Sequence, residues 1–512
     1  MIIADATPLF GLYARLRARR LARQDPVAAQ ERQLLGLVRR AAPTRFGREH
    51  GFASIGSVRD YQRRVPLRRH GDFWNEYWGP AYPALADCTW PGRVPYLAVT
   101  SGTASGSSKL IPVSRAMVAA NRRAALDVLV HHLARHPSSR VLGGKSFMLG
   151  GSTDLEPLGQ GVRKGDLSGI AAVEIPLWAR PWSFPPRAAA LDADWERKID
   201  RLARLSLGLD IRAIGGTPGW VLLFLERLAD IAGRGPAVRE LYPGLEIYVH
   251  GGVSFRPYRE RFRVLMEGSR AEPREVYPAS EGFIAIADRG CGEGLRLLLD
   301  NGLFFEFVPA AEADAPAPPR HWLADAELGR DYAIVLTSCA GLWSYVLGDT
   351  VRLVSLDPPR LLVSGRLSYR LNAFGEHLSG EQIEDGVMAG AEAAGLDVSE
   401  YAVGALFTEA ASKGRHVFVV EVQGAVPRQA LAVFAAALDG ALRAGSLDYR
   451  ERRAGDLALL PPDVLAVPAG FYAAWMKSRG RLGGQSKVPR VILDESLLAG
   501  LLAAARAAAP AG

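Results

Sequence analysis

The chain has 512 residues, of which 48% are apolar and 23% charged, which allows a large buried core and excludes wholesale disorder. The formal charge of +8 comes from residues 1–70, which hold 15 Arg and 5 acidic residues, whereas the other 442 residues hold 47 basic and 49 acidic groups. This distribution argues against a basic nucleic-acid-binding domain. Because no apolar run reaches about 18 residues, we also expect no membrane partner.

The basic excess is centred on residues 15–20, which read RLRARR. Arg alternates there with Leu and Ala at helical spacing, so we interpret the segment as a solvated helix face with Arg stems packed along apolar surface. The three cysteines, Cys88, Cys291 and Cys339, are odd in number and widely spaced. They are typical of a protein from the reducing cytoplasm and argue against a disulfide framework.

Short β-type runs alternate with helical periodicity along the chain, which predicts an α/β fold with substantial parallel sheet. The predicted helices cover 11–42, 117–132, 220–232, 381–394 and 428–443, and an irregular aromatic segment surrounds Trp74, Tyr77, Trp78 and Tyr82. The predicted strands cover 96–100, 146–149, 211–214, 245–250, 296–299, 332–338, 351–355, 361–364, 402–407 and 416–422. The pattern breaks near Gly365, so we predict a large domain over 1–364 and a small α+β domain over 365–512.

The strongest local signal is the segment 100–109, TSGTASGSSK, directly after a predicted strand. Its hydroxyls, its unobstructed glycine N–H groups and the terminal Lys109 are partners that a phosphate chain needs. The glycine spacing is not that of a Walker A loop. A flexible linker is the alternative, but linkers seldom connect a buried-type strand to Leu110-Ile-Pro and a helix.

Three further segments are weak evidence for a functional site when each is taken alone. They are Tyr277–Gly282 (YPASEG), Tyr345–Asp349 (YVLGD) and the glycine-rich stretch 480–490 (GRLGGQSKVPR), which contains Lys487. Each can be an ordinary turn or surface loop. His131, His132 and His136 lie on or just after the helix predicted over 117–132, without Cys or carboxylate at ligand spacing, so a metal site is not expected there.

In this order the four segments resemble the auxin-responsive Gretchen Hagen family of acyl-acid amido synthetases in its bacterial form, within the adenylate-forming superfamily. The resemblance covers nearly the whole chain, with further similarity at 150–153, 165–168 and 467–471. It implies an adenylate-forming fold, in which a large N-terminal α/β domain with helix-flanked sheets precedes a smaller mobile C-terminal α+β domain.

The resemblance also implies a ligase that forms C–N bonds. A carboxylic acid attacks the α-phosphate of ATP, giving an acyl-adenylate and pyrophosphate, and an amine, usually an amino acid, then displaces AMP. ATP would be the co-substrate and Mg²⁺ the metal, and the partners would be a small carboxylic acid and an amine. Such a protein has to align its reactants and stabilise charge that builds up on phosphate oxygens.

The resemblance assigns roles to individual residues. Lys487 and Glu281 would be catalytic: Glu281 would hold Mg²⁺ with the phosphates, and Lys487 would swing in from the small domain to neutralise the α-phosphate and carboxylate. Asp349 would bind ribose. The nucleotide-binding set would be Ser101, Gly102, Thr103, Ser105, Gly106, Lys109, Tyr277, Pro278, Ala279, Ser280, Glu281, Gly282, Asp349, Arg366 and Lys487. The amine acceptor would lie near Ser152, Thr153, Pro468, Gly470 and Phe471.

Two alternatives stay open at this point. The acyl group could pass to a thiol of coenzyme A or of a carrier protein instead of an amine. The chain could also be a catalytically silent nucleotide-binding homologue, because residues 343–346 (WSYV) lack arginines common in the family. Ala104-Ser105 also departs from the usual Ser-Gly, which affects the finer contacts expected of the phosphate loop. His250 could border the acyl pocket or be a hydrogen-bonded structural residue. No motif identifies the acid, the acceptor or the oligomeric state.

Overall fold

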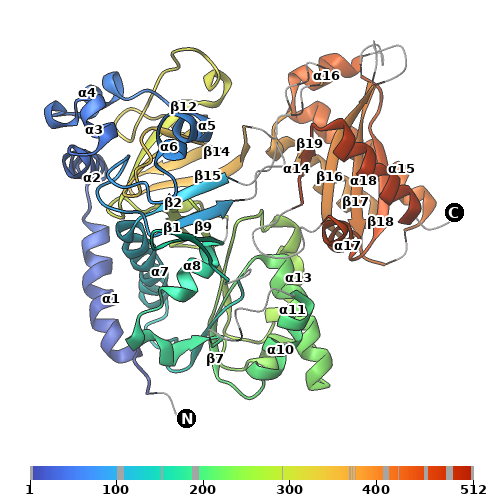
Figure 1. Cartoon of the computed structure of the whole chain (residues 1–512). Coiled ribbons are helices and arrows are strands. Elements are labelled where there is room, and N and C mark those ends of the chain that lie inside the picture. The colour runs from blue at the N-terminus through green and yellow to red at the C-terminus, as the bar shows by residue number, and fades with distance from the viewer. Residues whose placement is uncertain are drawn as a thin grey trace. The chain divides into compact units, whose positions relative to one another are not determined.

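The computed structural model describes residues 4–100, 109–150, 154–186, 189, 195–290, 292–367, 371, 373–374, 376, 378–407, 414–424, 426–454, 459–479 and 488–508. These residues form two compact units (Figure 1). The first contains the described residues up to Leu347 together with Val351–Leu362. The second contains Gly348–Thr350 and the described residues from Val363 onward.

An eleven-stranded mixed sheet runs through the first unit. Its order is β12 (Leu303–Pro309), β13 (Asp331–Ser338), β14 (Tyr345–Leu356), β15 (Pro359–Arg366), β11 (Leu295–Leu297), β10 (Gly282–Ile286), β9 (Glu272–Ala279), β8 (Ile247–Gly251), β7 (Ile211–Gly215), β3 (Lys145–Met148) and β6 (Ser183–Phe184). Strands β6, β3, β7, β8 and β9 are parallel neighbours, whereas β9, β10, β11 and β15 pair antiparallel. The predicted α/β architecture is therefore confirmed.

Helices cover the parallel strands on both faces. On one face α10 (Trp195–Ser206), α11 (Pro218–Ala232) and α13 (Arg259–Met266) pack against Ile214 and Tyr248 (Figure 1). On the other, α1 (Thr7–Ala22) and α7 (Arg115–Arg135) pack against Ala213 and Ile247. Adjacent strand residues reach opposite layers because side chains alternate across a sheet. Strands β7 (IRAIG) and β8 (IYVHG) are mostly apolar, as expected of strands that are buried on both faces.

A smaller four-stranded sheet in the same unit has the order β2 (Lys109–Val113), β1 (Tyr96–Thr100), β5 (Val162–Gly165) and β4 (Glu156–Gly159). Strands β1 and β2 pair antiparallel, so that Thr100 faces Lys109. Helix α7 follows β2 directly, and the hydroxyl of Ser114 caps it by accepting the N–H of Met117 at 3.1 Å. The order of strand, loop, strand and helix is thus fixed around the segment 101–108.

The second unit is a three-layer sandwich. Its sheet has the order β18 (Asp463–Pro468), β17 (Gly414–Val422), β16 (Val398–Phe407) and β19 (Val491–Ile492). Helices α14 (Gly380–Ala394) and α15 (Arg428–Gly445) pack on one face. Helices α17 (Phe471–Ser478) and α18 (Glu495–Ala508) pack on the other, where Val488 also contacts the core. Because the core covers both faces of the sheet, this unit has an apolar centre of its own.

Further helices of the described chain are α2 (Pro26–Ala41), α3 (Arg45–Glu49), α4 (Val58–Arg64), α8 (Leu167–Val173), α12 (Val238–Leu241) and α16 (Leu447–Arg453). No helix among the described residues is both long and apolar enough to cross a membrane. Cys88 and Cys339 are free and buried, and burial raises the pKa of their thiols to about 11 and about 12. These two cysteines therefore act as apolar core residues.

The aromatic segment expected to be irregular is helical. A π-helical turn, η2 (Trp74–Trp78), joins α5 (His70–Phe73) to α6 (Gly79–Ala81). Trp78 is fully buried, and its ring stacks on Phe73 with centroids 4.8 Å apart. The burial of these rings outweighs the modest helix propensity of aromatic residues, which is the signal that made the segment look irregular.

The basic face of α1 also differs from the expectation, because Arg17 is not solvated. Its guanidinium forms a two-pronged bond to Asp127 of α7, at 2.9 and 2.7 Å, and a second one to Asp300, at 2.7 and 2.9 Å. The Asp127 side chain is fully buried, and that of Arg17 is 11% exposed. Arg17 therefore fixes α1 to the body of the first unit, while Arg19 stays exposed.

Candidate functional site

The β9–β10 hairpin carries the first group of predicted site residues. Strand β9 ends at Ala279, which pairs with Gly282 across a two-residue turn formed by Ser280 and Glu281. Both turn residues are nearly buried, with 7% and 8% of their surface exposed. A Cβ on Gly282 would lie 2.7 Å from the side chain of Leu303, so glycine lets the hairpin pack closely against β12. The hairpin thus holds the Glu281 carboxylate at its tip.

Tyr277 and Pro278 precede that turn on β9. Tyr277 is 8% exposed and belongs to the main core of the first unit, whereas Pro278 pairs with Phe283. The structure therefore brings together the whole predicted segment Tyr277–Gly282 on one hairpin. Its two strands fix the position of the acidic turn.

Lys109 opens β2 opposite the last residue of β1. The other predicted phosphate-loop residues, Ser101, Gly102, Thr103, Ser105 and Gly106, lie outside the described residues. The β1–β2 pairing fixes both ends of their segment within one strand-to-strand distance.

The second unit holds another part of the predicted nucleotide site. Asp349 on β14 and Arg366 on β15 form an ion pair of 2.9 Å, from the carboxylate Oδ1 to the guanidinium Nε. Gly348 has φ of +96°, and its carbonyl accepts the N–H of Leu367 at 2.7 Å. Asp349 is 8% exposed. Its carboxylate is oriented by a cation and has the acceptor capacity to bind a sugar hydroxyl as well.

Residues 343–346, which lack the arginines expected from the family resemblance, include a residue with a structural role. The hydroxyl of Ser344 lies 2.7 Å from Nη2 of Arg320 and 2.9 Å from a carboxylate oxygen of Glu306. Ser344 and Glu306 are fully buried. A small polar side chain at this position thus completes a buried network, for which a longer arginine would need different space.

The predicted acceptor residues in the second unit differ in how far they are buried. Pro468 ends β18 and is exposed, and Gly470 has φ of +81° directly before α17. Phe471 packs in the core of the second unit, with its ring 5.3 Å from that of Tyr472. Phe471 therefore anchors the turn, and Pro468 and Gly470 supply its exposed surface. Ser152, Thr153 and Lys487 lie outside the described residues.

The parallel strands of the first unit bring several of these segments to one edge. Gly150 follows β3, Gly251 ends β8 and Ser280 follows β9, so all three lie at carboxyl ends of parallel strands. A Cβ on Gly251 would lie 2.3 Å from the carbonyl oxygen of Val276, so glycine is needed for this close approach. Ligands of open α/β sheets bind at this edge.

His250 lies one residue before that edge, on β8. It is 1% exposed, and its ring stacks on Phe255 with centroids 3.9 Å apart. Burial lowers its pKa to about 3, so the imidazole is neutral at physiological pH. Neither ring nitrogen has a hydrogen-bond partner among the described residues, so the expectation of a hydrogen-bonded structural histidine is wrong. The ring packs among aromatic side chains instead, and its relation to the acyl pocket stays a prediction.

Comparison with known proteins identifies the family. The GH3 family N-terminal domain matches residues 15–157, the central domain matches 296–366 and the C-terminal domain matches 381–496. The chain belongs to the GH3 family. This confirms the resemblance inferred from the motifs, and the three matches follow in chain order across both units of this GH3 protein.

Curated GH3 relatives align over part of their length. A probable indole-3-acetic acid-amido synthetase GH3.9 from Oryza sativa subsp. japonica is 28% identical over 244 residues, which are 43% of this chain and 54% of that protein. The jasmonoyl-L-amino acid synthetase JAR4 of Nicotiana attenuata is 32% identical over 127 residues, 23% of this chain and 21% of that protein. The chain thus spans between about a fifth and about half of the length of these curated relatives.

Solved structures resemble this GH3 protein over nearly its whole length. The AtGH3.15 acyl acid amido synthetase in complex with 2,4-DB has a TM-score of 0.80 and 16% identity, covering 98% of this chain and 96% of that one. A 2-hydroxyisobutyryl-CoA ligase in the postadenylation state has a TM-score of 0.61 and 16% identity, covering 96% and 94%. The fold is therefore that of adenylate-forming enzymes.

Proposed function

We propose that this GH3 protein is an ATP-dependent acyl-acid amido synthetase. The observation that carries the proposal is the β9–β10 hairpin, which holds Glu281 nearly buried at the carboxyl edge of the parallel strands. The names of the curated relatives, an indole-3-acetic acid-amido synthetase and a jasmonoyl-amino acid synthetase, support an acid and an amine as reactants. The substrates would be a small carboxylic acid, ATP and an amine, with an amino acid as the expected acceptor.

The proposed reaction has two steps that share one site. A carboxylate oxygen of the acid attacks the α-phosphorus of ATP, the bond to the bridging oxygen breaks and pyrophosphate leaves. The amine nitrogen then attacks the acyl carbon, the carbon–oxygen bond to the phosphate breaks, AMP leaves and the nitrogen loses a proton. Adenylation is needed because a carboxylate has no good leaving group, and AMP supplies one.

The residues of both units would divide this work. Asp349, oriented by Arg366, would accept hydrogen bonds from ribose, and Lys109 with the loop before it would contact phosphates. The carboxylate of Glu281 is a hard oxygen donor, which fits Mg²⁺ bound by one protein carboxylate together with phosphate oxygens and water. When bound, Mg²⁺ would supply positive charge beside the phosphates. Residues 1–364 would act as the adenylation domain and 365–512 as the domain that delivers Lys487.

Acid-dependent exchange of radioactive pyrophosphate into ATP tests the first step. A panel of aryl, alkyl and hydroxy acids should contain at least one that supports exchange, and that acid plus an amine mixture should release AMP and an amide of the combined mass. Exchange with no acid in the panel, despite ATP binding, would favour a silent nucleotide-binding homologue.

A thiol acceptor is the second candidate, because the same fold occurs in 2-hydroxyisobutyryl-CoA ligase. Mass spectrometry of products formed with amines and coenzyme A in competition separates the two. An amide product supports the amido synthetase. A thioester product would instead support an enzyme that transfers the acyl group to a thiol.

We predict that Lys487→Ala slows adenylation by roughly 10²–10³-fold, because it removes one charge-stabilising donor. Amide formation from separately supplied acyl-adenylate should be less affected. The two half-reactions are measured by pyrophosphate exchange and by amide release. An equal loss in both would contradict the assignment of Lys487 to the first step.

We predict that Asp349→Asn raises the KM for ATP by roughly 10–100-fold, the range expected when a hydrogen bond to a charged group is lost. The KM for the acid should stay unchanged. Asp331→Asn serves as the matched control, because Asp331 pairs with Arg352, which lies on β14 like Asp349. An equal KM for ATP in the two variants would mean that Asp349 does not bind the nucleotide.

A further inference from the structure

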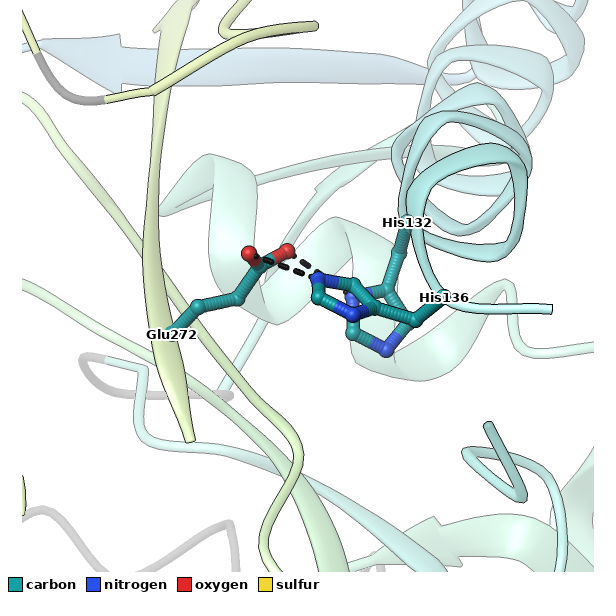
Figure 2. Close-up of side chains that lie close together, drawn as sticks. All are labelled: His132, His136 and Glu272. Atoms are coloured by element: carbon teal, nitrogen blue, oxygen red, sulfur yellow. Dashed lines mark hydrogen bonds and ion pairs between the residues drawn. The ribbon is translucent and has the colours of Figure 1, made fainter. Parts of the chain in front are cut away.

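Three side chains with metal-binding atoms meet where α7 ends and β9 begins (Figure 2). His132 lies in the last turn of α7, His136 follows the helix one turn later, and Glu272 is the first residue of β9. Nδ1 of His132 is 3.0 Å from Oε1 of Glu272, and Nε2 of His136 is 2.9 Å from Oε2. The three ligand atoms lie within 4.8 Å of one another.

We propose that His132, His136 and Glu272 bind a Zn²⁺ ion. Two imidazoles four residues apart share one helix face, and with one carboxylate they form a donor set that zinc prefers. Zinc bonds of about 2.0–2.2 Å in a tetrahedron place neighbouring donors about 3.3 Å apart. The separations of 3.0 and 2.9 Å involve different oxygens of Glu272, so the side chains have to turn before one oxygen and both imidazoles face the same ion. The three candidate ligand atoms lie within 4.8 Å of one another, which side-chain rotation can reduce.

The surroundings of His132 support this site. Its other ring nitrogen, Nε2, lies 3.8 Å from a carboxylate oxygen of Glu246. Glu246 is itself held by Nη1 of Arg212 at 2.9 Å and by the backbone N–H of Arg140 at 3.0 Å. At 3.8 Å this carboxylate is beyond hydrogen-bond distance, so it adds negative charge beside His132 and does not fix the orientation of its ring.

The exposure of two of the three side chains is suitable for an ion. The His136 side chain is 45% exposed and that of Glu272 is 25% exposed, so the ion can arrive from solvent and keep a water as its fourth ligand. The guanidinium of Arg274 hydrogen bonds to Oε1 of Glu272. That contact leaves Oε2, on the side of His136, as the oxygen that bonds the ion.

The proposed ion is distant from the nucleotide site. Glu272 begins β9 and the Ser280–Glu281 turn follows its end, so the two sites are separated by an eight-residue strand, roughly 25 Å at 3.3 Å per residue. The ion therefore joins α7 to the sheet and stabilises the first unit, and it takes no part in catalysis.

The test uses the full chain after treatment with a chelator. Zn²⁺ is added near neutral pH without nucleotide, excess is removed by dialysis, and the zinc retained per chain and the thermal midpoint are measured. We expect one zinc per chain and a higher midpoint, because a ligand that binds only the folded state stabilises it. His136→Ala should lose both effects.

His321→Ala is the matched control. His321 also has a carboxylate four residues away, with Nδ1 3.6 Å from Asp325, and its replacement should leave the zinc content unchanged. His136 is half-exposed, so its variant should fold. A wild-type chain that retains no zinc, or equal zinc in the wild type and in His136→Ala, would overturn the proposal. Acid-dependent pyrophosphate exchange should be equal in the wild type and in His136→Ala. Absence of exchange in both proteins would therefore count against the proposed enzyme function and not against the zinc site.

Discussion

Glu281→Gln should reduce acid-dependent pyrophosphate exchange by roughly 10²–10³-fold while the protein stays folded. The substitution keeps the shape of the side chain in the β9–β10 turn and removes its negative charge. Because Glu281 is only 8% exposed, its charge acts in a poorly solvated place, where electrostatic interactions with bound cations are strong. The exchange rate at saturating ATP and acid measures the effect.

Glu260→Gln is the matched control for this experiment. Glu260 is exposed on α13, where it pairs with Arg263 at 2.7 Å, and exposed pairs of this kind contribute little. Its exchange rate should equal that of the wild type. If Glu281→Gln also kept the wild-type rate, the carboxylate would have no part in adenylation, and the hairpin would no longer carry the proposed function.

Arg17→Ala should lower the free energy of unfolding of the first unit by about 3–5 kcal/mol. The substitution leaves Asp127 with a fully buried carboxylate and without the two-pronged bond that Arg17 supplies. Leaving a charge buried and uncompensated is among the most destabilising single changes known in proteins. The measurement is urea unfolding followed by the fluorescence of tryptophan.

Arg19→Ala provides the comparison on the same helix. Arg19 is exposed on α1, and alanine is the best helix former, so its urea midpoint should lie close to that of the wild type. A loss of stability in Arg17→Ala no larger than that of Arg19→Ala would mean that α1 is not held by this ion pair.

The regular elements of the fold could be predicted because their signals are local. Strand 96–100, helix 117–132 and strand 211–214 correspond to β1, α7 and β7 within a few residues, since apolar periodicity and flanking turn residues lie within each segment. The ordered motifs predicted the family, and three family matches along the chain confirm it.

The partners of individual charged side chains could not be predicted in this way. Arg17 bonds to residues 110 and 283 positions away, and His132 bonds to Glu272 at a separation of 140. Local spacing around His132 contains no carboxylate partner, whereas the sheet brings Glu272 beside the helix. No local pattern could have signalled Glu272, because its position depends on how β9 packs against α7.

The assignment of Glu281 and Asp349 to a nucleotide site stays a prediction. Glu281 and Asp349 were singled out by motif resemblance, and the physical basis for each emerged only from the structure: a two-residue hairpin turn for one and an ion pair with Arg366 for the other. The packing of Phe471 could not be foreseen, because a motif does not distinguish a residue that touches a ligand from one that anchors the turn.

The packing of Val488 bears on the role proposed for Lys487. Val488 is the next residue in the sequence, and it contacts the core of the second unit. Under the role proposed for Lys487, delivery of the ammonium group would thus be timed by motion of a whole domain, and turnover should slow as solvent viscosity rises.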